Sequence, residues 1–154
     1  MDHLEPVVNS VLKGENYFYT SLGNSLVFDA DLMSNICTLI ESKLITDISF
    51  VLADNNKVVT DAFYKKDFSR IKWLKSFYET ISIHKEESKA FDHHLINPLK
   101  LVLARHLTTK VSVLKKHLAS SGLIHINIDA MIFKTESKCF DDINLNLNYN
   151  STSP

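Results

Sequence analysis

Glycine is scarce in this sequence, and its scarcity excludes two common kinds of nucleotide site. The 154 residues include only three glycines, Gly14, Gly23 and Gly122, and no two of them are close in the chain. A phosphate-binding loop and a dinucleotide fingerprint each need several glycines within a few positions. The Gly-x-Ser-x-Gly turn that presents a nucleophilic serine is absent as well. The sequence therefore predicts neither a nucleotide cofactor nor a serine nucleophile.

Cysteines and long apolar runs are also rare. The two cysteines, Cys37 and Cys139, lie far apart and follow no metal-ligand spacing, so we expect reduced thiols. No apolar run reaches the ~18 residues that indicate a membrane span. The start of the chain, with Asp2 and Glu5, lacks the basic region of a signal peptide. These features predict a cytoplasmic protein.

Neither charge nor histidine spacing indicates a site. The formal net charge is −1, too small for a global field that attracts nucleic acid or an anionic membrane. His93 and His94 are adjacent, so on a helix they point in different directions. His117 and His125 have no cysteine or carboxylate at a zinc-ligand spacing. We therefore expect no metal, no cofactor and no catalytic residue, and we predict that the chain is not an enzyme.

The clearest positive signal is alternation of apolar and polar residues near the C-terminal end. Residues 110–118 and 123–133 alternate and are separated by the small residues 119–122, which predicts a β-hairpin. A third alternating run, residues 143–148, extends the sheet as an edge strand after a loop at 134–142. The expected buried face of the second arm consists of Ile124, Ile126, Ile128, Ala130 and Ile132. The predicted fold class is α+β, an antiparallel hairpin sheet of three or more strands packed against amphipathic α-helices.

The expected helices lie earlier in the chain. Apolar residues at helical spacing predict a short helix over residues 4–12 and a longer one over 31–44, capped by Asp29 or Asp31. A further helix runs from Asp67 to about residue 81, followed by a polar link at 82–88. The last helix runs through residues 91–107, and Pro98 either begins it, with Asn97 as its cap, or kinks it.

Between the second and third helices we expect a second, short hairpin. Residues 47–53 form its first strand, residues 54–56 its turn and residues 57–59 its second strand. The predicted organisation is an N-terminal amphipathic helix at 1–14, a single α+β domain at 15–148 and a flexible tail at 149–154. The N-terminal helix presents Val7 and Val11 either to its own domain or to another subunit.

A cluster of basic residues indicates a possible surface site in the third helix. Aromatic residues Tyr64 and Trp73 are interleaved with the basic residues, a combination typical of single-stranded nucleic-acid sites. The alternative, which we favour, is an ordinary solvated helix face. The basic residues are Lys65, Lys66, Arg70, Lys72 and Lys75.

The region where the last helix meets the predicted hairpin resembles a known family. Residues 101–113 read Leu-Val-Leu-Ala-Arg-His-Leu-Thr-Thr-Lys-Val-Ser-Val, and residues 123–132 read Leu-Ile-His-Ile-Asn-Ile-Asp-Ala-Met-Ile. This region resembles the small baseplate wedge subunit of contractile injection systems. The resemblance lies in the order of its features, which are a helix end, a short link, a valine-rich strand, a turn and an apolar-x-Ile-x-Ala strand. That family includes the lysozyme-like wedge protein of contractile phage tails and its type VI secretion counterpart. The match covers mainly residues 95–148, and Arg105 alone remains of the family's Glu-Pro-Arg triplet.

The resemblance implies a non-enzymatic structural protein of a baseplate, which offers a sheet edge to start sheath assembly. Its implied partners are wedge and sheath subunits. Arg105 is expected to bind a partner's carboxylate, or else only to cap the end of its helix. The edge strand presents Ile143, Leu145 and Leu147 to the partner. The alternative function is a small cytosolic regulatory or adaptor domain, which senses a ligand or associates with nucleic acid.

Overall fold

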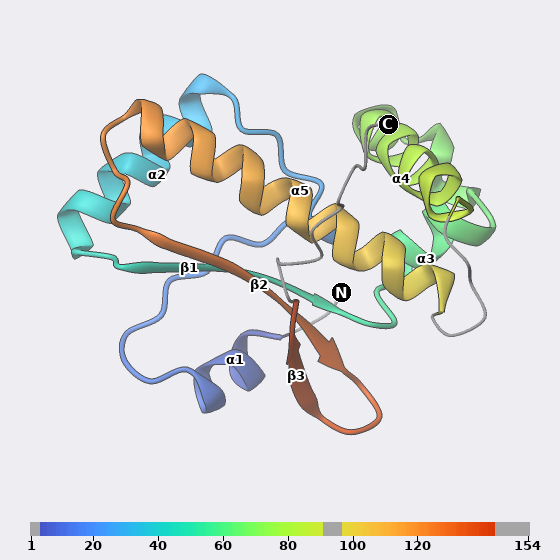
Figure 1. The fold of residues 1–154 in the computed structure, drawn as a ribbon, viewed down its shortest axis with the longest axis horizontal. Helices are drawn as coiled ribbons and strands as arrows, with labels where there is room; N and C mark the ends of the chain where they lie inside the picture. The colour runs from blue at the N-terminus through green and yellow to red at the C-terminus, as the bar shows by residue number, and fades with distance from the viewer. Residues whose placement is uncertain (1–3, 91–96, 144–154) are drawn as a thin grey trace, which may run out of the picture.

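The computed structural model describes residues 4–90 and 97–143. Its sheet has three strands in the order β1-β2-β3. Helices α2 (Ala30–Lys43) and α5 (Pro98–Ser120) lie on one side of this sheet, and α1 (Glu5–Val11) lies on the other (Figure 1). Helices α3 (Lys57–Tyr64) and α4 (Lys75–Ser88) pack together at one end of α5. The α+β prediction agrees with this architecture.

The sheet is mixed, which corrects the prediction of an antiparallel one. Strand β1 (Asp47–Ala53) runs parallel to β2 (Asn127–Lys134), although the two are widely separated in the chain. Strand β2 pairs antiparallel with β3 (Cys139–Asp142), which forms where a loop was expected. Parallel neighbours require a long crossover, and here the crossover contains α3, α4 and α5.

The predicted hairpin at residues 110–133 is wrong in its first arm, because residues 98–120 form the single helix α5. Its buried residues recur three or four positions apart, which is helical spacing and outweighs the short alternation at 111–113. The residues 119–122 end this helix instead of forming a hairpin turn. Gly122 has φ +78°, and the Leu123 N–H donates to the Leu118 carbonyl at 2.9 Å, as in a glycine-terminated helix. The buried apolar residues of α5 are Val102, Leu103, Leu107, Val111, Leu114 and Leu118.

The second predicted hairpin is also wrong, since residues 57–64 form α3. The Asn56 side chain accepts hydrogen bonds from the N–H groups of Val58 and Val59, at 3.2 and 3.1 Å. An asparagine at this position caps a helix as readily as it forms a turn. The cap redirects the chain after β1 and so removes the expected second strand.

The third expected helix begins and ends later than predicted. Residues Asp67–Arg70 and Lys72–Leu74 are short 3-10 turns, and α4 starts at Lys75 and includes the expected polar link. The reason is burial of one face, because Ile81, His84 and Ser88 are buried although the segment is polar overall.

Other local predictions are confirmed. The Leu32 N–H donates to the Asp29 side chain at 2.8 Å, so Asp29 caps α2. The Leu99 N–H donates to Asn97, and Pro98 begins α5. Of the predicted buried face of β2, four side chains are buried: Ile126, Ile128, Ala130 and Ile132. The fifth, Ile124, precedes the strand and is 80% exposed. Among the described residues, no helix is long and apolar enough to cross a membrane.

Candidate functional site

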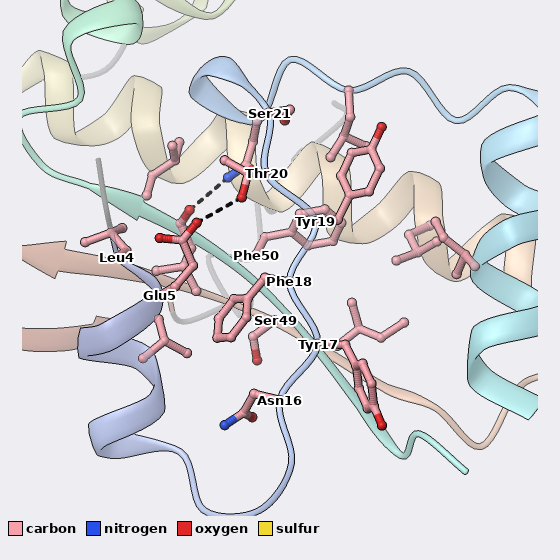
Figure 2. Close-up of a pocket in the computed structure, with 18 of the residues that line it drawn as sticks. Leu4, Glu5, Asn16, Tyr17, Phe18, Tyr19, Thr20, Ser21, Ser49 and Phe50 are labelled. Atoms are coloured by element: carbon pink, nitrogen blue, oxygen red, sulfur yellow. Dashed lines mark hydrogen bonds between the residues drawn. The ribbon is translucent and has the colours of Figure 1, made fainter. Parts of the chain in front are cut away.

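A large cleft lies between the N-terminal segment, α2 and β1. Its volume is about 640 Å³. The segment 16–21 crosses the view of Figure 2 as an extended chain, with β1 behind it carrying Ser49 and Phe50. Helix α1 closes one side of the cleft. The apolar lining includes Leu4, Val8, Leu22, Leu26, Phe28, Leu32, Ile36, Ile40, Ile45 and Ile48.

The N-terminal wall of the cleft is held by polar contacts on its own surface. The Thr20 hydroxyl donates to the Glu5 carboxylate at 3.0 Å (Figure 2). The Asn16 amide donates to Asn9 at 3.0 Å. Three consecutive aromatic residues on this wall remain partly open to solvent. Their exposed fractions are 38% for Tyr17, 44% for Phe18 and 68% for Tyr19. The wall therefore offers aromatic surface for a bound molecule.

Two polar atoms of the cleft lining are buried without a partner among the described residues. They are Ser21 Oγ and Asp129 Oδ1. Asp129 lies on β2 directly opposite Ser49 of β1. A buried polar group without a hydrogen bond costs about 1–3 kcal/mol, so a donor supplied by a ligand would be favourable at both atoms.

The other carboxylate on this part of the sheet already has partners. Asp47 accepts hydrogen bonds from the Thr46 hydroxyl and from the Asn127 amide, the latter at 3.1 Å. These hydrogen bonds, the first from Thr46, lower the pKa of Asp47. Asp47 therefore stays ionised and already accepts hydrogen bonds, whereas Oδ1 of Asp129 has no described hydrogen-bond donor.

A second buried polar cluster lies between α4, α5 and the turn Leu22–Asn24. His106 Nε2 is 2.9 Å from the Gly23 carbonyl, and burial lowers the pKa of His106 to about 4. Burial also lowers the pKa of His84, whose Nδ1 is 3.4 Å from Glu87. Both imidazoles are thus neutral near pH 7. The turn residues Leu22, Gly23 and Asn24 line the cleft, whereas His84, Glu87 and His106 do not.

Arg105 does not lie at a helix end, which corrects the predicted capping role. It sits within α5, and its Nε is 2.6 Å from Glu87 of α4. Helix α5 continues well beyond it, so the terminal carbonyls are out of reach. The described contact of Arg105 with Glu87 joins two helices of the same chain.

The residues predicted to contact partners fall in different parts of the fold. Val11 is 55% exposed on α1, and Val7 beside it is half-buried. Ile143 packs against the core, and its N–H donates to the Ala130 carbonyl at 3.0 Å. Leu145, Leu147 and the predicted tail at 149–154 lie outside the described residues. A role for these side chains in partner binding therefore remains a proposal.

The basic residues of the predicted nucleic-acid patch are all exposed, but they do not share one helix. They extend from the end of α3 through two 3-10 turns to the first residue of α4. Tyr64 and Trp73 are 61% and 66% exposed beside them. Lys75 Nζ lies 4.0 Å from the Glu79 carboxylate, which offsets part of the positive charge.

Sequence reasoning missed the cleft because its parts are not linked by any motif. Ser21 lies in a segment without periodicity, and Asp129 alternates with apolar residues as any solvent-facing strand residue does. Only the pairing of β1 with β2 and the path of residues 16–21 bring these residues together. A polar residue at the centre of an otherwise apolar strand was the single available signal.

Comparisons with known proteins identify a shared fold. No protein-family model and no curated protein matches the sequence. The structure is similar to a β-carbonic anhydrase of the filamentous fungus Aspergillus fumigatus, with a TM-score of 0.60 and 17% sequence identity. The match covers 80% of this chain and 72% of that chain. Two single-residue variants of the same enzyme match with the same TM-score and 18% identity.

These similarities correct the sequence-based function. The baseplate resemblance is wrong, since the fold is that of β-carbonic anhydrases and not of a wedge subunit. The predicted roles in type VI secretion, contractile tails and sheath assembly are therefore wrong as well, and so are the predicted wedge and sheath partners. The prediction of a non-enzymatic protein is contradicted too, because the similar structures are enzymes. The regulatory or adaptor alternative gains no support from them.

Carbonic anhydrases act through a zinc-bound hydroxide, which requires protein ligands that hold the zinc ion. Among residues 4–90 and 97–143, no three His, Cys, Asp or Glu side chains come together as a metal site. Cys37 is half-buried on α2, and Cys139 is exposed on β3 beside Ser137. The described donors do not fit zinc, and no zinc-dependent step is assigned to them. The chain has the fold of β-carbonic anhydrases at 17 to 18% identity, and its cleft is lined by two buried polar atoms without a described partner, Ser21 Oγ and Asp129 Oδ1.

Proposed function

We propose that this chain binds a small organic molecule in the cleft between residues 16–21 and β1. The ligand has an apolar or aromatic body and at least one hydrogen-bond donor. The observation that carries this proposal is the pair of buried, unpartnered acceptors, Ser21 Oγ and Asp129 Oδ1, in the lining of one cleft.

The size and chemistry of the cleft support such a ligand. Small-molecule sites are typically ~300–1,000 Å³, mostly apolar, with a few polar groups that orient the ligand. The cleft here, at about 640 Å³, falls within that range. The partly exposed aromatic residues Tyr17 and Phe18 supply flat surface for a ring. The similarity of the fold to enzymes with a small substrate is consistent with this use.

Asp129 is the residue on which recognition depends. A hydrogen bond to a charged group contributes about 1.5–3 kcal/mol, more than a bond between neutral groups. Hydroxyl and amino groups are therefore the donors that this cleft selects. If the ligand is a substrate, the same carboxylate is placed to accept its proton.

The test is a screen of paired aromatic fragments, in which each phenol or aniline is compared with its methyl analogue by ligand-observed NMR. We expect the donor-bearing member to bind and its methyl analogue to bind more weakly. Asp129→Asn should weaken binding by about tenfold to a hundredfold. Asp142→Asn is the matched control, since Asp142 is exposed on β3 and lies outside the cleft.

A stability measurement separates ligand recognition from folding. Ser21→Ala removes an atom that has no described partner, so the free protein should melt at or above the temperature of the parent. Ligand affinity should nevertheless fall. Equal affinity of the parent, Ser21→Ala and Asp129→Asn for every fragment would refute the proposal. Carbonic anhydrase activity, measured with and without added zinc, is the companion assay.

A further inference from the structure

A basic and aromatic surface lies at the end of the molecule that α3 and α4 form. The two 3-10 turns between these helices, Asp67–Arg70 and Lys72–Leu74, carry most of it. Residues 64–83 contain five basic side chains and two acidic ones, Asp67 and Glu79, so their net charge is +3 in a chain whose total is −1. The basic residues, all exposed, are Lys65, Lys66, Arg70, Lys72 and Lys75. This basic surface is therefore positive against the sign of the whole molecule.

Most of these cations have no carboxylate in contact. Lys75 and Glu79 form an ion pair at 4.0 Å, and both side chains are largely exposed. The other four basic residues form no ion pair within the described part of the chain. An exposed ion pair contributes at most about 1 kcal/mol, so even Lys75 can exchange its partner for another anion.

An open groove of about 550 Å³ runs between the first of these turns and α4. Lys66 and Ser69 line it from the turn, and Lys75 and Ser82 line it from the helix. Ammonium and hydroxyl groups are common protein ligands of phosphate oxygens. The remaining lining residues are Tyr78, Glu79 and Ile83. The groove thus offers cations and hydroxyl donors on both of its sides.

The same segment exposes three large aromatic side chains. Phe68 is 50% exposed, and Tyr64 and Trp73 are more exposed than Phe68. Rings this open to solvent contribute little to a core, but they offer a face to a flat partner. A base stacked on such a ring contributes about 1–3 kcal/mol. A groove lined by cations and open ring faces are the two parts of a single-strand binding site.

The buried Asp61 carboxylate fixes the conformation of this segment. It accepts hydrogen bonds from the N–H groups of Asp67 and Phe68, at 3.2 and 3.1 Å, and from the Tyr78 hydroxyl. Asp61 belongs to α3 and Tyr78 to α4, so the carboxylate joins both helices to the turn between them. A surface held in this way needs little ordering when a ligand binds, which favours affinity.

We propose that the basic surface binds single-stranded nucleic acid, with phosphates in the groove and bases stacked on the exposed rings. A lipid membrane can also be anionic, but a flat array of head groups cannot enter a groove, whereas a single strand can. The proposal is independent of the small-molecule site, because no residue from 64 to 83 lines the cleft. Helices α3 and α4 lie at the opposite end of α5 from α2 (Figure 1).

The test measures fluorescence anisotropy of labelled thymidylate and uridylate oligomers of about 15 nucleotides, titrated with the full chain. We expect both to bind. If about three to five phosphates are neutralised, the association constant should fall about 20- to 130-fold between about 50 and 200 mM salt. Trp73 is the only tryptophan in the sequence, so a base stacked on it should quench the intrinsic fluorescence of the protein.

Variants separate stacking from charge. Trp73→Ala should weaken binding about 5- to 150-fold, whereas Trp73→Phe keeps a ring for stacking and should lose much less. Lys66→Gln should weaken binding to both oligomers and lower the salt exponent by about 0.7. Lys116→Gln is the matched control, since Lys116 is an exposed lysine of α5 outside the basic surface, and it should bind like the parent. Thermal melting of each variant checks that the fold is unchanged.

A duplex and a lipid vesicle test the alternatives. A duplex of the same length should bind more weakly than the single strands, because its bases are stacked on each other and present no open face. Parent-like affinity of Trp73→Ala, or equal affinity for duplex and single strand, would overturn the proposal. Binding to vesicles of phosphatidylcholine and phosphatidylserine, with no binding to either oligomer, would overturn it in favour of a membrane surface.

Discussion

Acid should destabilise this protein through His106, and the structure permits an estimate of how much. The His106 ring is 1% exposed, and its Nε2 contacts the Gly23 carbonyl. Burial, the largest cause, lowers its pKa from 6.5 to about 4. The neutral ring donates from Nε2–H to the carbonyl, while Nδ1 has no described partner. The imidazolium would be buried without a counter-ion in contact.

The sign follows from proton binding in the two states. Between pH 6.5 and pH 4 the unfolded chain protonates His106 and the folded chain does not, so stability falls with pH in this window. The contribution of the neutral His106 to stability is fully present above pH 6.5. The loss of stability between pH 7.5 and pH 4.5 from this residue is about 2–3 kcal/mol. For a chain with about 5–15 kcal/mol of stability, that is a large fraction.

The assay is urea denaturation of the parent and of His106→Gln at pH 7.5 and 4.5. Glutamine keeps a side-chain donor for the Gly23 carbonyl but does not titrate. His84, whose pKa burial also lowers, and the Lys110 ammonium act on residue 106 in both proteins, so the difference between the stability losses of the two proteins reports on His106. We expect the parent to lose about 2–3 kcal/mol more than the variant. Equal losses would refute the assignment of a buried, neutral His106.

Two further predictions concern the core. Ile128→Asp places an unpaired charge at a side chain that is 2% exposed, so the protein should unfold or become insoluble; a parent-like melting temperature would contradict the face assigned to β2. Tyr78→Phe removes the hydroxyl that donates to the buried Asp61 carboxylate, which also accepts from the N–H groups of Asp67 and Phe68. The expected loss is about 1–3 kcal/mol in the free energy of unfolding, and a loss below that range would show that Asp61 is satisfied without Tyr78.

Local chemistry determined several elements of this fold from the sequence alone. Residues 47–53 form a strand as predicted, Asp29 is the cap of α2 from the two predicted candidates, and Asn97 with Pro98 begins α5, one of the two predicted arrangements. These features depend on hydrogen bonds and dihedral preferences within a few residues, and distant contacts do not override them. Burial of Ile128 followed from alternation along one strand in the same way.

Tertiary structure decided the features that depend on packing between distant segments. Residues 111–113 alternate as a strand would, but Leu107, Val111, Leu114 and Leu118 are buried together on one helical face. Local propensity is weak compared with that burial. The same holds at Asn56, where the choice between a turn and a helix cap depended on whether α3 packs on the core.

The candidate site lies entirely at this tertiary level. Ser21 and Asp129 are remote in the chain, and neither belongs to a motif. The parallel pairing of β1 with β2 places Asp129 beside Ser49, and the path of residues 16–21 brings Ser21 to the same cleft. Strand pairing requires a complementary neighbour, which the sequence of one strand does not specify. For this reason alternation predicted the strands β1 and β2, whereas their parallel order and the cleft beside β1 emerged only from the folded chain.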